Sequence, residues 1–280
     1  MKNSKSDRQR VFLVGSARSG TTLLQSILAS HPEITSFPET HFFRGTIPKI
    51  SFLRWINIYG ENERNFIKDY LHRIDRTDLN HLVPSSTLFT KKWIKGIIDL
   101  IDALPTNPES TIWVEKTPMH LYFVSLIYEV NSDTKFIHII RDGKDVVASL
   151  FEASRNNPES FDGSQSIQKC IFRWKIDIQI HKKHLGKENH FFIFYKDIIN
   201  KTDNALKQLC KFLGIDYLDQ MKSFSKKTRE LKFEDETWKP DQSDEIRESH
   251  KFDRIFSDEE KAQIRSQVNS VDLDIFRNSF

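Results

Sequence analysis

The segment from Gly15 to Thr22 constrains the fold more than any other part of the sequence. It joins a short apolar run, Val11 to Val14, to residues with helical spacing, and its two glycines are separated by four residues. That spacing between a strand and a helix is typical of a P-loop, whose backbone N–H groups and helix N-terminus bind phosphate oxygens. We therefore expect this loop at the carboxyl end of a buried strand.

The cation of this loop lies at a distinctive position. A nucleotide triphosphatase has Lys directly after the second glycine, whereas here Thr21 follows Gly20 and the cation is Arg18, inside the loop. The alternative is a tight strand–helix turn that binds nothing. An arginine buried in a turn of glycine and serine is costly without an anion, so the sequence favours an anionic ligand.

Further apolar runs predict the rest of the fold. Strands are expected over Thr111–Val114, Phe136–Ile140 and Phe191–Tyr195 in addition to the first one. The expected helices are Thr21–Ser30, Met119–Val130, Asp145–Glu152, residues 166–185 and Asn204–Leu213, the last closed by Gly214. Strands that alternate with helices predict parallel pairing through helical crossovers. The fold class is therefore α/β, a P-loop-type three-layer fold with a central parallel sheet flanked by helices.

Other segments give weaker signals. Residues 33–48 are broken by proline and are expected to form a loop, and residues 50–104 show helical pieces without a clear strand. Residues 222–280 are charged and have fewer apolar anchors. We expect a flexible N-terminal tail over residues 1–9 and a single domain over residues 10–280.

Composition and charge exclude some classes of function. The net charge is only +3, which gives no reason to expect a nucleic-acid partner. The first apolar run is too short for a signal peptide, and no stretch reaches the roughly 18 apolar residues of a membrane span. The sequence therefore predicts no membrane association and a cytoplasmic location. Cys170 and Cys210 cannot form a disulfide framework or a zinc site, and we expect two buried thiols.

A second candidate phosphate anchor follows the strand Phe136–Ile140. Arg141 stands at the end of this strand, and Ser149 lies eight residues later, on the helix after Gly143. A guanidinium group and a hydroxyl group in this arrangement can hold one phosphate. The alternative is a capped helix with surface charges.

These motifs together resemble the sulfotransferases that use 3′-phosphoadenosine 5′-phosphosulfate (PAPS). The run Arg18-Ser-Gly-Thr-Thr-Leu-Leu, then His31-Pro-Glu and Glu39-Thr40, is similar to the tyrosylprotein sulfotransferase branch. Cytosolic relatives usually have Lys in place of Arg18. The resemblance implies that the 5′-phosphosulfate binds to Arg18, Ser19, Gly20, Thr21 and Thr22. It implies that Arg141 and Ser149 hold the 3′-phosphate, and that the product is adenosine 3′,5′-bisphosphate.

The resemblance also suggests catalytic residues. Glu39 matches the catalytic base, with His41 as the rival base that cytosolic relatives would use, while His31 is expected to be a helix-end residue. Lys116, together with Arg18, would stabilise the transition state, unless Lys116 is an ordinary lysine paired with Glu115. Tyr195 matches a tyrosine near the 3′-phosphate and adenosine, Trp174 is expected to be a core residue despite its family counterpart, and Lys251 is a candidate to cover the cofactor. No metal is expected, because sulfuryl groups carry less charge than phosphoryl groups.

The predicted function is thus transfer of a sulfuryl group to a hydroxyl or amine of a small-molecule, sugar or peptide acceptor. Vertebrate tyrosylprotein sulfotransferases carry a membrane anchor and lumenal disulfides, which this sequence lacks, so a soluble bacterial-type enzyme is the preferred interpretation. Two alternatives remain open: a P-loop kinase with Asp142 as a metal-binding acid, and a non-catalytic binder of adenosine bisphosphate.

Overall fold

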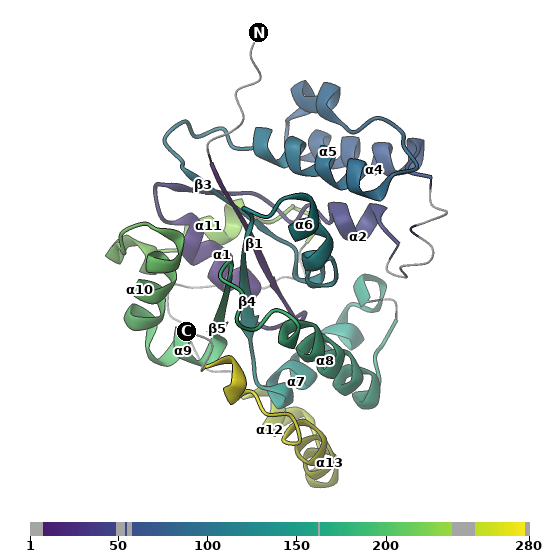
Figure 1. Ribbon diagram of the computed structural model, residues 1–280. Helices are drawn as coiled ribbons and strands as arrows, with labels where there is room; N and C mark the ends of the chain where they lie inside the picture. The colour runs from purple at the N-terminus through teal and green to yellow at the C-terminus, as the bar shows by residue number, and fades with distance from the viewer. Residues whose placement is uncertain (1–7, 49–53, 55–57, 162, 237–249, 278–280) are drawn as a thin grey trace.

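The computed structural model describes residues 8–48, 54, 58–161, 163–236 and 250–277. These residues form a five-stranded sheet in which every pairing is parallel, in the order β2-β3-β1-β4-β5 (Figure 1). The strands are β1 (Gln9–Gly15), β2 (Ile34–Ser36), β3 (Ile112–Lys116), β4 (Lys135–Ile140) and β5 (His190–Phe194). The predicted central parallel sheet is confirmed.

The register of the sheet brings the predicted site segments together. Leu13 of β1 lies beside Lys116 of β3 and beside Ile137 of β4. The carboxyl ends of the three central strands therefore meet at one edge, where Gly15, Lys116 and Arg141 are found. This edge is where ligands bind in open parallel sheets.

Helices cover both faces of the sheet, as expected (Figure 1). Their bounds are α1 (Thr21–Ala29), α2 (Phe42–Thr46), α4 (Glu61–Arg73), α5 (Thr90–Ala103), α6 (Val124–Val130), α7 (Gly143–Asn156), α8 (Ile167–Lys182), α9 (Tyr195–Asn200), α10 (Thr202–Leu213), α11 (Ser225–Glu230), α12 (Lys251–Ile255) and α13 (Asp258–Val268). Short 3-10 helices are η1 (Thr77–Leu82), η2 (Pro118–Phe123), η3 (Pro158–Phe161), η4 (Asp219–Lys222) and η5 (Asp274–Phe276).

The alternation of side chains along β1 explains the three layers. Phe12 and Val14 point into a core shared with α2, α4, α5 and α6. Val11 and Leu13 point to the opposite face, where α1, α10 and α11 pack. Because both faces are covered, β1 reads in the sequence as one continuous apolar run, as central parallel strands do.

The segment predicted to be a loop over residues 33–48 is the main local error. It contains β2, which pairs with β3 through only three residues, and α2, which is held by the buried Phe42 and Phe43. Elements of three and five residues are too short to show a periodicity, and tertiary contacts form them.

Three boundaries also differ from expectation. The tail predicted over residues 1–9 lies outside the described residues up to residue 7, and Gln9 already belongs to β1. The helix predicted over Met119–Val130 is a 3-10 helix, η2, followed by α6. Tyr195 begins α9 instead of ending β5.

The C-terminal part is better anchored than its charge suggested, because Phe252 of α12 and Ile264 of α13 join a core with α7 and α8.

Candidate active site

The phosphate loop between β1 and α1 has a backbone that few residues can adopt. Gly20 has φ 94°, and a side chain there would collide with the ring of Tyr195, whose Cδ2 lies 2.3 Å from the position of a β-carbon. Arg18 has φ 71°, a strained value for a residue with a side chain. Strain of this kind persists only where surrounding contacts fix it, and it is concentrated at functional sites.

Two arginines meet at this loop: Arg141 is buried and Arg18 is partly buried. Arg141, at the end of β4, donates a hydrogen bond from Nη1 to the carbonyl oxygen of Arg18 at 2.9 Å and stacks 4.2 Å from the ring centre of Tyr195. Arg18 donates from Nε to Oγ of Ser149 at 3.3 Å. Burial and the nearby Arg141 lower the pKa of Arg18. Two guanidinium groups that line one cavity and lie close enough to lower the pKa of Arg18 favour a ligand with several negative charges.

The structure places the predicted residues around one cavity of about 400 Å³. The predicted residues that line it are Arg18, Gly20, Thr21, Thr22, Glu39, His41, Arg141, Ser149, Tyr195 and Lys251. Ser19 is buried in the loop behind it, and within the described residues its hydroxyl has no hydrogen-bond partner. The same is true of Nε of Arg141. Both groups are donors that a phosphate oxygen could satisfy.

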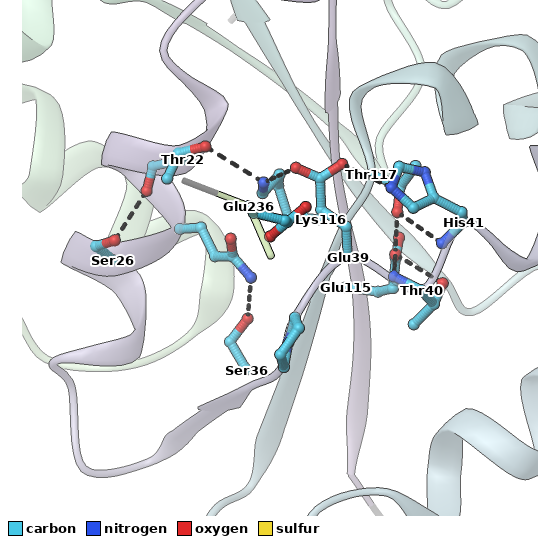
Figure 2. A network of polar contacts seen from close by, with 12 residues as sticks. Thr22, Ser26, Ser36, Glu39, Thr40, His41, Glu115, Lys116, Thr117 and Glu236 are labelled. Atoms are coloured by element: carbon cyan, nitrogen blue, oxygen red, sulfur yellow. Dashed lines mark hydrogen bonds and ion pairs between the residues drawn. The ribbon is translucent and has the colours of Figure 1, made fainter. Parts of the chain in front are cut away.

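Glu39 lines this cavity and forms an ion pair with the buried Lys116. Lys116 is 2% exposed and contacts Oε1 of Glu39, and its Nζ also donates to Oγ1 of Thr22 at 3.3 Å (Figure 2). Oε2 of Glu39 lies 3.4 Å from Nε2 of His41. Lys116 is therefore linked both to the phosphate loop and to the candidate base, and it does not pair with Glu115.

His41 is the second candidate base, and its surroundings favour the neutral form. Burial lowers its pKa, and Glu39 only partly offsets this effect. A neutral imidazole at 3.4 Å from the carboxylate of Glu39 can donate a hydrogen bond to it without adding a charge. Of the two candidate bases, Glu39 is the one that also forms an ion pair with Lys116.

Several residues considered in the sequence analysis are buried in the protein and lie outside the cavity. Trp174 is 1% exposed, packs against the turn at Gly143 and donates to the carbonyl oxygen of Arg141, so the predicted core role is confirmed. His31 is buried just after α1 and is bonded to the carbonyl oxygen of Asp216. Cys170 and Cys210 are buried free thiols, and burial raises the pKa of each to about 11.

Asp142 does not have the place that a kinase would require. Its carboxylate accepts from the backbone N–H of Lys144 at 3.0 Å and caps α7. A capping carboxylate is already engaged at the helix end and is not directed at the phosphate loop.

Other residues of the cavity were not foreseen. The unforeseen lining residues include Arg44, Met119, Ser160, Phe161, Arg173 and Glu236. Arg44 lies on α2, which was expected to be loop. The only signal in the sequence that Arg44 belongs to the site is that it follows the candidate base His41 by three residues. Arg173 is next to Trp174 in the sequence, but nothing in the helical pattern of α8 indicates that it reaches the cavity.

Lys251 lines the cavity from the C-terminal part of the chain. It forms an ion pair with Glu152 of α7, which also pairs with Arg254 at 2.6 Å. Glu152 stands one helical turn after Ser149, so Lys251 lies close to the second phosphate anchor. Its contact with a cofactor stays a prediction.

The donors of this cavity fit a nucleotide with two separate phosphate positions. One position is the loop from Arg18 to Thr22, with its backbone N–H groups and the N-terminus of α1. The other is the fork of Arg141 and Ser149, and the ring of Tyr195 lies beside both.

Sequence comparison gives an independent result. A family model described as "Sulfotransferase family" matches residues 10–219. A protein-tyrosine sulfotransferase of Drosophila melanogaster is 25% identical over 212 residues, which are 75% of this chain and 38% of the relative. Protein-tyrosine sulfotransferase A of Caenorhabditis elegans is 23% identical over 214 residues, 75% of this chain and 51% of the relative. The chain thus spans about half or less of these relatives.

Solved structures agree on the fold. A sulfotransferase domain from the curacin biosynthetic pathway superposes with a TM-score of 0.57 at 18% identity, covering 94% of this chain and 98% of that one. Mouse sulfotransferase SULT7A1, solved in a complex with PAP, gives a TM-score of 0.56 at 16% identity over 97% of this chain and 85% of that one. At such identities the likeness establishes the fold.

The cytoplasmic location predicted from the sequence is contradicted by these relatives. They are protein-tyrosine sulfotransferases, and the prediction rested only on the absence of a long apolar stretch, which does not determine a location. Within the described residues, every helix is too short or too polar to cross a bilayer.

Proposed function

Because the chain belongs to the sulfotransferase family, we propose that it transfers a sulfuryl group from PAPS to a hydroxyl group of an acceptor. One observation carries the proposal: Arg18, Arg141 and Ser149 line the same cavity as Glu39, and Glu39 pairs with the buried Lys116. A binding protein would need only the first three residues. A buried carboxylate–ammonium pair beside the phosphate loop adds the groups that transfer requires.

Each residue has a role that follows from its place. Arg18, Ser19, Gly20, Thr21 and Thr22 would hold the 5′-phosphosulfate, and Arg141, Ser149 and Tyr195 would hold the 3′-phosphate side of the nucleotide. PAPS supplies the sulfuryl group when bound. Arg18 and Lys116 are placed to stabilise negative charge near the phosphate loop, because Lys116 already bonds to Thr22.

Glu39 is proposed as the general base that removes the acceptor's proton. It lines the cavity, and its second oxygen faces His41 instead of the protein core. The neutral His41 would orient the carboxylate and shape the acceptor end. In-line attack then needs only positioning and charge stabilisation, so no metal enters the proposal.

The cavity has charged side chains beyond the two phosphate arginines. Arg44 of α2, Arg173 of α8 and Lys251 line it, together with one carboxylate besides Glu39, that of Glu236. The matched relatives are named for protein tyrosine, and a tyrosine within an acidic peptide would suit these cations. We therefore place a peptide with a phenolic hydroxyl first among the acceptor classes, ahead of small phenols and sugars.

The test combines binding with transfer. Saturating adenosine 3′,5′-bisphosphate at about a hundredfold excess over Kd should stabilise the protein by roughly 2.7 kcal/mol in thermal melting, whereas ATP with Mg²⁺ should do much less. Labelled PAPS should then sulfate acidic tyrosine peptides faster than the same peptides with Phe in place of Tyr. Stabilisation by ATP with Mg²⁺ alone would contradict the proposal.

A further inference from the structure

Glu115 is a wholly buried carboxylate beside the cavity to which the proposed chemistry gives no role. Side chains alternate along β3, so Glu115 points to the face opposite Lys116. It is 0% exposed, and it accepts hydrogen bonds from Oγ1 of Thr40 at 2.9 Å, Oγ1 of Thr117 at 2.6 Å and Nδ1 of His120 at 2.8 Å.

The surroundings of Glu115 favour its ionised form. Burial by itself raises the pKa of Glu115, but His120 and the hydroxyl groups of Thr117 and Thr40 outweigh burial, and the pKa is lowered. A buried charge is retained only where its hydrogen-bonding capacity is satisfied. Here two of the three donating side chains belong to segments that form the wall of the cavity.

Glu115 and its neighbours hold the loop that carries Glu39. Glu39 contacts Lys116, Thr40 contacts Glu115, and the backbone N–H of His41 donates to Oγ1 of Thr117 at 3.2 Å (Figure 2). Three consecutive loop residues are thus bonded to three consecutive residues at the end of β3.

This attachment explains a strained residue. His41 has φ 52°, in the left-handed region, which costs about 1–3 kcal/mol for a residue of this kind. Its N–H is fixed by Thr117, and its carbonyl oxygen accepts from the N–H of Gly45 at 2.7 Å. The turn at His41 directs the chain, which comes from β2, into α2, and Glu39 just before it lines the cavity.

We propose that Glu115 is a positioning residue: through Thr40 and Thr117 it fixes the backbone of residues 39–41 so that the carboxylate of Glu39 is presented to the acceptor. The inference rests on the proposed function, since it assigns an effect on Glu39 as the base. Displacement of a reacting group by about 1 Å can reduce a rate about 10²-fold. Arg18 lies in the loop after β1, Arg141 directly after β4 and Ser149 on α7, so these three phosphate anchors should not depend on the hydrogen bonds of Glu115.

The test removes one hydroxyl at a time. Thr40→Val keeps the branched shape and deletes the hydroxyl that donates to Glu115, while Thr40→Ser keeps the hydroxyl. We expect Thr40→Val to lower kcat by about 10- to 100-fold and Thr40→Ser to stay within about threefold of wild type. The affinity for adenosine 3′,5′-bisphosphate should be unchanged in both variants.

Thr134→Val is the matched control. Thr134 is 0% exposed, and within the described residues its hydroxyl has no hydrogen-bond partner, so this variant removes a buried hydroxyl without breaking a bond. Its kcat should equal that of wild type. Glu115→Gln is a second variant for the same network, with bisphosphate affinity as the control for folding.

Hydrogen exchange of residues 39–46 gives a readout that does not need an acceptor. Exchange there should be faster in Thr40→Val and normal in Thr40→Ser and Thr134→Val. If wild type transfers no sulfuryl group, the proposed function fails, while exchange still tests the positioning. Normal exchange in Thr40→Val, a normal kcat, or no rescue by serine would overturn the inference.

Discussion

The chain buries two groups of titratable side chains against the same sheet, and only one of them opens into the cavity. The first group is the site cluster, Glu39, Lys116 and Glu115, which carries charge and is bonded across β3. The second is the histidine cluster, whose members are His138, His181, His184 and His190. His138 bonds to Nδ1 of His181 and to Nδ1 of His190, each at 2.8 Å.

The two clusters differ in how burial acts on them. Burial and the neighbouring histidines lower the pKa of His138, and burial lowers the pKa of His181 and His190 to about 3 and that of His184 to about 4. The histidine cluster is therefore neutral at pH 7. Within the described residues, no group of His, Cys, Asp or Glu is placed to bind a metal. Burial of titratable groups does not by itself distinguish the two clusters. The site cluster differs from the histidine cluster in keeping charged side chains next to a cavity.

Glu39→Gln tests the charged cluster most directly. The variant keeps the shape of the side chain and removes its basicity, so kcat should fall by about 10²- to 10⁴-fold while bisphosphate affinity stays normal. His41→Gln should cost about tenfold or less, because a neutral imidazole only orients the carboxylate. Initial rates with an acceptor peptide check both. A dead His41→Gln and a nearly normal Glu39→Gln would reverse the two roles.

Arg141→Ala separates binding from chemistry within the charged region. Loss of charge-assisted hydrogen bonds worth about 1.5–3 kcal/mol should weaken binding of adenosine 3′,5′-bisphosphate by roughly 10- to 100-fold. Binding of adenosine 5′-phosphate should weaken much less, because it lacks the 3′-phosphate. Calorimetric titration of both nucleotides measures the ratio. Equal losses for both would remove Arg141 from the 3′-phosphate site.

Acid should destabilise the protein through the histidine cluster. In the unfolded chain these side chains bind protons below about pH 6.5, whereas the folded state keeps them neutral down to a pKa of about 4 or lower. Stability is therefore complete above pH 6.5 and falls as the pH drops. At about pH 5.5 each such histidine lowers the free energy of unfolding by roughly 1.4 kcal/mol.

Thermal melting above and below pH 6.5 measures how much stability the protonation of the histidine cluster costs. His138→Phe should reduce the difference in Tm between about pH 7.5 and about pH 5.5, since one titrating group is removed. Phe192→Leu is the control: Phe192 stacks on His138 with ring centres 4.6 Å apart but does not titrate. It should lower Tm equally at both pH values. An unchanged pH dependence in His138→Phe would show that the cluster is not the source.

Removal of metal should have the smallest effect. Charge at the proposed site is supplied by Arg18, Lys116 and Arg141, so a chelator should leave the initial rate of sulfuryl transfer nearly unchanged. Rates with and without chelator, and after addition of Mg²⁺, make the measurement. Loss of activity in chelator with rescue by Mg²⁺ would mean that these side chains are insufficient.

The sequence allowed the phosphate side of the site to be predicted and much less of the acceptor side. Gly15, Gly20 and Arg18 lie within one loop between a strand and a helix, so local patterns determine their geometry. Arg141 and Ser149 likewise share one strand–helix junction. The roles of these residues in binding stay predictions until they are measured.

The acceptor side depends on contacts between distant segments. Thr40 bonds to Glu115, which is 75 residues later, and Arg44 and Arg173 meet the cavity from α2 and α8. α2 is short and follows a strained residue, so no periodicity indicates it. Pairing of Lys116 with Glu115 stayed open as an alternative because the strand was expected to end at Val114, whereas β3 extends to Lys116 and its side chains alternate between the two faces.

The pairing of β1 has a consequence for how the chain is made. Gln9 pairs with Ile112 and Val11 with Lys135, so the central strand has no partner in the sheet until more than a hundred further residues have left the ribosome. At about 5–20 residues per second, synthesis of these residues takes several seconds. During that time the apolar run Val11–Val14 has no strand of this sheet to pair with. Pairings this distant in sequence also fold slowly. The phosphate loop begins where β1 ends, and Arg141 and Tyr195, which contact it, are synthesised more than a hundred residues after it.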